Sequence, residues 1–220
     1  MKKAVIFDLD GTLIDTSVGI CNCVKYAESK LSLAPLCEEQ YLEFIGPPPY
    51  ETYQRLYGLS LEQSFQATEF HREYGKIKGI YEATVYDGII ELLAELKNNN
   101  CKLGVATYKR QDLADLILAH FNIAKYFDSI CGADSDNKLT KKDIIELCID
   151  NLSAKKDDVI YIGDSEYDAI AAQKIGVDFI GLTYGYGFKN NDKVAEFKSI
   201  GCANDVFGLF NLMKGNNNEY

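Results

Sequence analysis

Hydrophobic and polar positions follow two different periods along this chain. Short apolar runs of strand length occur at residues 4–8, 102–106, 128–132, 158–164 and 178–183. Stretches with the helical period follow at residues 88–99, 112–121, 141–152 and 167–176, with a last one near 205–213. Strands that alternate with helices along a chain form parallel sheets covered by helices on both faces. The pattern therefore predicts an α/β fold with a doubly wound parallel sheet.

One block interrupts this alternation. Residues 16–80 contain no strand candidate, and their helical patterns lie near 16–31, 38–45, 50–57 and 61–78. The stretch GPPPY at residues 46–50 separates two of these helices, and we expect its three prolines to fix an extended segment. The pattern predicts an all-helical cap at 16–80, inserted into a core formed by 1–15 and 81–220. The two connections are expected near 13–16 and 79–87.

Composition narrows the range of partners. A length of 220 residues suits one large domain, or one domain that carries a smaller insert. The net charge of −10 argues against binding a nucleic acid polymer through a broad basic face. No apolar run reaches the length of a membrane span, and Asp8 and Asp10 interrupt the first one, so neither a membrane partner nor an export signal is expected. The seven cysteines are scattered without a CxxC motif, which favours reduced thiols in a cytoplasmic protein. The protein is expected to be either a monomer or a homodimer.

Two carboxylates stand at the end of the first predicted strand. Asp8 and Asp10 are two positions apart and repel each other unless a positive group lies between them. In a doubly wound sheet, ligands bind at the carboxyl ends of the strands, where the later strands deliver Thr107 and Asp164. Carboxylate and carbonyl oxygens suit Mg²⁺. We therefore expect Mg²⁺ to be held by Asp8, Asp164 and the backbone carbonyl of Asp10.

The same edge of the sheet offers groups for phosphoryl transfer. Thr107 can present its hydroxyl, and the N–H groups that follow it, including that of Tyr108, to phosphate oxygens. Lys141, at the start of a predicted helix, can add a positive charge. Asp8 is the candidate nucleophile, which would form an aspartyl-phosphate. Asp10 is the candidate acid and base, protonating the leaving oxygen and then activating water.

Four motifs carry a resemblance to a known family. DLDGT (8–12), VATYK (105–109), the Lys141 of TKKDII and GDSEYD (163–168) resemble the motifs of the haloacid dehalogenase superfamily. The chain is similar, over essentially its whole length, to the phosphoglycolate phosphatase and 5′-nucleotidase branch, and IGPPPYET (45–52) resembles the cap loop of that branch. The resemblance implies a Rossmann-like core with a helical cap, Mg²⁺ as cofactor and phosphatase activity.

The resemblance also implies further roles. Asp168 matches the second acid of the last motif, which supports the metal site or orients Lys141. Lys138 and Lys142 compete with Lys141 for the phosphate-binding position, and the spacing to the apolar pair 144–145 favours Lys141. The cap loop, with Gly46, Pro47 and Pro48, is expected to set substrate specificity. Tyr108 departs from the Asn or Ser often found at its position.

Several alternatives stay open. The leading hypothesis is a Mg²⁺-dependent phosphomonoester hydrolase, and its substrate is a small phosphate ester such as phosphoglycolate, a nucleoside monophosphate or a sugar phosphate. A phosphomutase of the same fold is one alternative, and a phospho-receiver or phosphate-sensing module is another. Lys109 and Arg110 fit either a solvated helix start or substrate binding, and His71 and His120 fit packing or surface positions.

Overall fold

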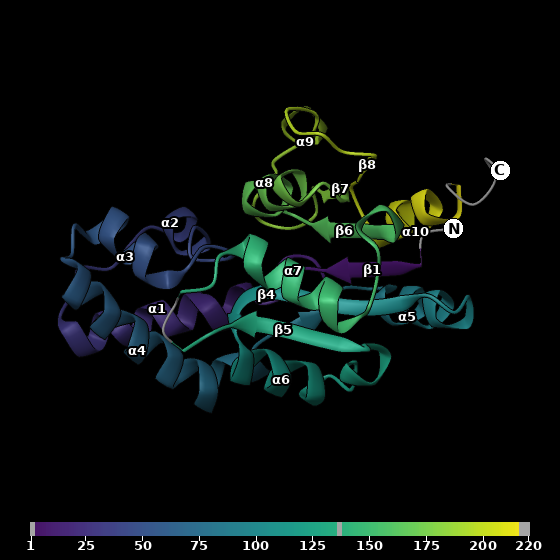
Figure 1. Cartoon of the computed structure of the whole chain (residues 1–220). Helices are drawn as coiled ribbons and strands as arrows, with labels where there is room; N and C mark the ends of the chain where they lie inside the picture. The colour runs from purple at the N-terminus through teal and green to yellow at the C-terminus, as the bar shows by residue number, and fades with distance from the viewer. Residues whose placement is uncertain (1–2, 136–137, 216–220) are drawn as a thin grey trace.

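The protein is built around a six-stranded sheet, all of whose paired strands are parallel (Figure 1). The computed structural model describes residues 3–135 and 138–215. In spatial order the strands are β5 (Ser129–Ala133), β4 (Lys102–Arg110), β1 (Ala4–Phe7), β6 (Val159–Gly163), β7 (Asp178–Leu182) and β8 (Gly201–Ala203). The predicted α/β class with a parallel sheet is confirmed. The short β8 was not predicted, because three residues show no reliable period.

Helices cover both faces of this sheet. The helices are α5 (Ile89–Asn98), α6 (Gln111–His120), α7 (Lys141–Asn151), α8 (Glu166–Ile175), α9 (Asn191–Ala195) and α10 (Val206–Gly215), with 3₁₀ turns at Ala124–Tyr126 and Lys156–Asp158. The central strand β1 alternates between two cores, because successive side chains point to opposite faces. Val5 and Phe7 pack with α5, α6 and α10, whereas Ala4 and Ile6 pack with α7, α8 and α9.

A second group of helices lies beyond the carboxyl ends of the strands, toward which the strand arrowheads point in Figure 1. It consists of α1 (Ser17–Leu31), α2 (Glu38–Leu42), α3 (Pro49–Tyr57) and α4 (Leu61–Ile77), followed by a 3₁₀ turn at Gly79–Tyr81. These helices share an apolar cluster of their own, with Val24, Tyr53 and Ala67 fully buried in it. Among the described residues, no helix combines the length and apolar character that crossing a membrane requires.

The proline-rich stretch differs from its prediction. Pro49 is the first residue of α3 and does not extend the preceding segment. A proline is accommodated in the first helical turn, because its missing N–H would have no partner within the helix there. The prediction that all three prolines fix an extended segment is therefore wrong for Pro49.

Two short strands join the helical group to the sheet. Strand β2 (Ile14–Asp15) pairs with β3 (Thr84–Val85) in an antiparallel ladder, with Ile14 opposite Val85. They lie within the connections expected near 13–16 and 79–87, although neither was predicted as a strand. The division into a core at 1–15 and 81–220 and a cap at 16–80 stays a prediction, and residues 1–2, 136–137 and 216–220 of it lie outside the described residues.

Candidate active site

The candidate residues gather where strands β1, β4 and β6 end. Asp8 follows β1, Thr107 lies in the last part of β4, and Asp164 follows β6. Lys141 is the first residue of α7, and Asp168 lies in the first turn of α8. All five side chains belong to buried residues, the most exposed being Lys141 at 4%. Residues far apart in the sequence thus meet because parallel strands end at one edge.

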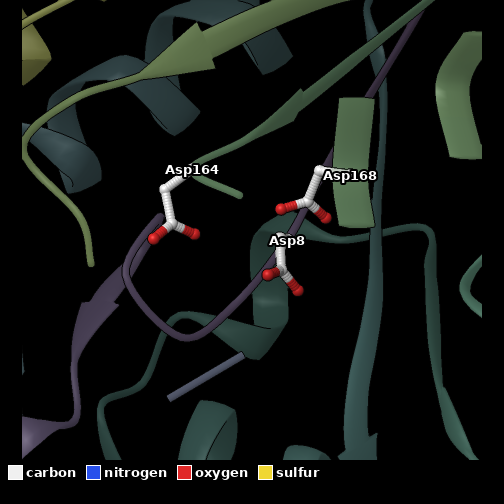
Figure 2. A group of neighbouring side chains, drawn as sticks. All are labelled: Asp8, Asp164 and Asp168. Atoms are coloured by element: carbon white, nitrogen blue, oxygen red, sulfur yellow. The ribbon is translucent and has the colours of Figure 1, made fainter. Parts of the chain in front are cut away.

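Three carboxylates form the centre of the site. Asp8, Asp164 and Asp168 each offer one oxygen, and these oxygens lie within 4.8 Å of one another. Figure 2 shows the three side chains gathered at one place in the site. Among the described residues the side chain of Asp10 does not join this group. Its carboxylate contacts the Lys109 ammonium instead, at 2.9 and 3.2 Å.

One lysine faces the three carboxylates. The Nζ atom of Lys141 lies 2.7 Å from Asp8 Oδ1 and 3.0 Å from Asp168 Oδ1. The start of α7 is fixed by Thr140, whose hydroxyl accepts a hydrogen bond from the Asp143 N–H at 3.3 Å. Lys142, the next residue, turns outward and pairs with Glu146 at 3.0 Å. The helix start therefore brings Lys141 to the carboxylates and directs Lys142 away from them.

The carboxylates of the last motif are held by hydrogen bonds. Asp168 accepts from the Tyr161 hydroxyl at 2.9 Å and from the N–H and hydroxyl of Ser165 at 3.0 and 2.6 Å. Asp164 accepts from the backbone N–H groups of Tyr186 and Gly187 at 2.7 and 3.2 Å. These bonds limit how either carboxylate can turn.

The loop after β7 must also approach Asp164 closely. A Cβ atom at Gly185 would overlap the Asp164 carboxylate and the carbonyl of Gly11. The glycines of TYGYGF (183–188) after a predicted strand were a signal for this close approach, and sequence reasoning missed it.

Burial and like charge raise the pKa values of Asp8 and Asp164, the two carboxylates expected to hold Mg²⁺. Burial raises the pKa of Asp8 to about 7, with Asp168 and Asp164 adding to the rise and Lys141 opposing it. Burial also raises the pKa of Asp164 to about 7, with Asp168 as the next cause. When ionised, the three carboxylates face one ammonium, which leaves two negative charges uncompensated. A divalent cation bound by oxygen ligands fits this arrangement.

The residues at the end of β4 have more than one role. Thr107 Oγ1 accepts a hydrogen bond from the Lys109 N–H at 3.1 Å. The Tyr108 hydroxyl accepts from the Lys141 N–H at 2.9 Å, and its ring centroid lies 5.5 Å from Lys141 Nζ. The side chain of Tyr108 therefore helps to place Lys141, whereas sequence reasoning had considered mainly its backbone. Nothing in the pattern signals this contact.

The proline loop meets the sheet edge across a cavity of about 100 Å³. Pro48 lines this cavity together with Pro49, Tyr50 and Glu51 from the helical group. The sheet side contributes Tyr108, Ala133, Lys138, Leu139 and Thr140, and Arg72 contributes from α4. Three loop residues were predicted to set specificity. Among the described residues that line this cavity, Pro48 is present, whereas Gly46 and Pro47 are not.

The two histidines differ in burial, His71 being buried and His120 exposed. His71 is buried, its Nδ1 is 3.5 Å from the Tyr53 hydroxyl, and burial lowers its pKa to about 3, so the ring is neutral at pH 7. The ring of His120 contacts Tyr81 edge to face. His71 therefore agrees with a packing position and His120 with a surface position.

Known proteins resemble the chain over nearly its whole length. Residues 5–182 match the family model described as haloacid dehalogenase-like hydrolase. The chain is 34% identical over 211 residues to a 5′-nucleotidase from Pseudomonas aeruginosa, covering 96% of this chain and 95% of the relative. It is 29% identical to a phosphoglycolate phosphatase from Photorhabdus laumondii, covering 84% and 82%. The crystal structure of a predicted phosphatase from Clostridium acetobutylicum matches with a TM-score of 0.92 and 38% identity, covering 98% and 99%.

Proposed function

The chain belongs to the haloacid dehalogenase-like hydrolase family, and we propose that it is a Mg²⁺-dependent phosphomonoester hydrolase acting on a small phosphorylated metabolite. The relatives named as 5′-nucleotidase and phosphoglycolate phosphatase support the phosphatase class. The observation that carries the proposal is the buried group of three carboxylates facing Lys141 at the sheet edge. Such a site combines a nucleophile with positive charge for a phosphate.

Asp8 is the proposed nucleophile. One of its oxygens attacks phosphorus, the bond between phosphorus and the ester oxygen breaks, and an aspartyl-phosphate forms. Asp10 gives its proton to the departing ester oxygen and, as a carboxylate, then takes a proton from the water that attacks the phosphorus. The water oxygen ends in the released phosphate, and Asp8 is regenerated. Lys141 and the hydroxyl of Thr107 are proposed to bind the phosphate oxygens.

Mg²⁺ is the proposed cofactor. Asp8, Asp164 and the backbone carbonyl of Asp10 would hold it. Asp168 is better suited to orienting Lys141, because both of its oxygens already accept hydrogen bonds from Tyr161 and Ser165. When bound, the ion would offset the repulsion among the carboxylates and between them and the anionic substrate.

The helical residues 16–80 are proposed to cover the site as a cap. The paired strands β2 and β3 mark both of its connections to the core. Pro48 is proposed to contact the leaving group, since it lines the cavity between the two parts. The cap loop would then decide among phosphoglycolate, nucleoside monophosphates and sugar phosphates.

Trapping the covalent intermediate tests the assigned roles. The Asp8→Asn and Asp10→Asn proteins are exposed briefly to p-nitrophenyl phosphate, quenched in acid and weighed intact by mass spectrometry. This ester has a good leaving group that needs little protonation, so Asp10→Asn should still become phosphorylated and should lose the phosphate slowly. Asp8→Asn should carry no adduct. An adduct on Asp8→Asn would place the nucleophile elsewhere and refute the mechanism.

Product analysis separates hydrolase from phosphomutase. With a sugar phosphate as substrate, a hydrolase releases inorganic phosphate, whereas a mutase returns the phosphoryl group to the sugar. We expect phosphate release to match substrate consumption.

A further inference from the structure

Asp10 has a lysine partner of its own. The Lys109 Nζ atom contacts both carboxylate oxygens of Asp10, at 2.9 and 3.2 Å. The side chains are 13% and 9% exposed, so the pair is largely removed from water. Asp8 pairs instead with Lys141 at 2.7 Å. The two acids that follow β1 are therefore held by different lysines, which come from different elements.

An irregularity in β4 brings Lys109 to this position. Ala106 pairs with Cys131, but the next paired residue is Arg110, opposite Ala133. Three residues of β4 thus lie opposite one residue of β5, Gly132. Bulges of this kind re-aim side chains and are common beside active sites. The regular alternation of a strand is interrupted just where Thr107, Tyr108 and Lys109 meet the site.

Local contacts fix the backbone of this bulge. The Lys109 N–H donates to Thr107 Oγ1 at 3.1 Å. A Cβ atom at Gly132 would lie only 2.6 Å from the Lys109 carbonyl oxygen, so the close approach requires glycine. The Gly132 N–H also donates to Gln111 Oε1 at 2.6 Å. The position of Lys109 is therefore set by the surrounding structure.

The charges of the pair act on two buried residues of the helical group. The charges of Lys109 and Asp10 both act on the pKa of His71 in α4 and on that of Cys23 in α1. Both of these residues are buried, and burial holds His71 neutral and raises the pKa of the Cys23 thiol to about 12. Neither residue therefore carries a charge at pH 7 that would disturb the pairing of Lys109 with Asp10.

We infer that Lys109 is a positioning residue, which holds the Asp10 carboxylate where the ester oxygen leaves and water enters. This inference rests on the proposed acid and base role of Asp10. An ammonium that contacts both oxygens restricts rotation of the carboxylate, and displacements of about 1 Å can reduce catalysis about a hundredfold. The separate pairing also keeps Asp10 apart from the group around Asp8, so one acid can act as nucleophile while the other transfers protons.

Dependence on the leaving group tests the inference. We would measure kcat and KM of the wild type, Lys109→Met, Lys109→Gln and Lys109→Arg with p-nitrophenyl phosphate, phenyl phosphate and an alkyl phosphate. The loss of kcat/KM, which reports the steps up to phosphorylation of Asp8, should in Lys109→Met and Lys109→Gln be at least about tenfold larger for the alkyl ester than for p-nitrophenyl phosphate, because only the poor leaving group needs the proton. Lys109→Arg should recover part of the lost kcat/KM, since it restores the positive charge.

Two controls make the outcome decisive. Lys142→Met removes a lysine that pairs with Glu146 on the surface and should leave all rates unchanged. The double variant Asp10→Asn, Lys109→Met should be no slower with the alkyl ester than Asp10→Asn alone, because both changes disable the same step. Melting curves and retained phosphorylation by p-nitrophenyl phosphate show that the variants are folded.

Opposite results would overturn the inference. If Lys109→Met and Lys109→Gln lose the same factor in kcat/KM with every ester, or if the kcat/KM losses of Asp10→Asn and Lys109→Met multiply in the double variant, Lys109 does not act through Asp10 in leaving-group protonation. If the wild type hydrolyses none of the esters, the proposed function itself fails. The two failures are therefore distinguishable.

Discussion

Replacing Lys141 by methionine should expose the repulsion among the buried carboxylates. The Lys141 ammonium is 2.7 Å from Asp8 and 3.0 Å from Asp168, and its side chain is only 5% exposed. Removing one partner of a buried ion pair costs about 3–5 kcal/mol, because the remaining charge is left without compensation. At about 2–4 °C per kcal/mol for a chain of this size, the melting temperature should fall by about 6–20 °C.

The loss of stability in Lys141→Met should depend on pH. The pKa values of Asp8 and Asp164 are about 7 in the folded chain, above the ordinary value of 3.8, so the folded state binds more protons between these values. The stability that these two carboxyl groups contribute is therefore fully present below about pH 4 and falls as the pH rises to about 7. The Lys141 pKa is raised, so its ammonium stays charged throughout this range. The effect of Lys141→Met should thus be larger at about pH 8 than at about pH 5.5.

Thermal unfolding in the presence of a chelator measures both effects. Wild type, Lys141→Met and Lys142→Met would be melted at the two pH values. Lys142→Met is the matched control, because it removes an exposed lysine one position away and should not change the melting temperature measurably. The reasoning would be refuted if Lys141→Met melts like the wild type at both pH values. It would also be refuted if its melting temperature falls by the same amount at both.

Three further predictions concern the metal, the loop after β7 and the cap. Mg²⁺ should raise the melting temperature of the wild type more at about pH 8 than at about pH 5.5, because protonated carboxyls bind the ion poorly, and equal shifts would contradict this. Gly185→Ala should weaken Mg²⁺ binding in calorimetry, since its Cβ would overlap the Asp164 carboxylate. Gly75→Ala, whose Cβ would lie 3.5 Å from Cys23 Sγ, should bind Mg²⁺ normally. Pro48→Ala should change the ranking of phosphate esters and spare p-nitrophenyl phosphate, whereas an unchanged ranking would make Pro48 purely structural.

Sequence reasoning performed well where a local pattern carries the information. The longer strands and helices were predicted because apolar residues recur along them with the period of a strand or a helix. Strands β2, β3 and β8 contain two or three residues, and the short helix α9 contains five, so no period could be seen in them. Pro49 was assigned to the wrong element, because proline fits both an extended segment and a helix start.

The sequence by itself determined the class of fold and the set of residues at the sheet edge. Parallel strands deliver their carboxyl-end residues to one place, so Asp8, Thr107 and Asp164 could be assigned to a common site before any coordinates were known. Lys141 could be assigned, in preference to Lys138 and Lys142, from its spacing to the apolar pair 144–145.

Only the tertiary structure decided which of these groups face one another. Asp168 lies against Asp8 and Asp164, whereas the side chain of Asp10 turns to Lys109 across a bulge in β4. The bulge depends on the close approach of β5 at Gly132, a contact between segments far apart in the chain. Pairings of this kind follow from side-chain direction and from the register between neighbouring strands, which the hydrophobic period of a single segment does not contain.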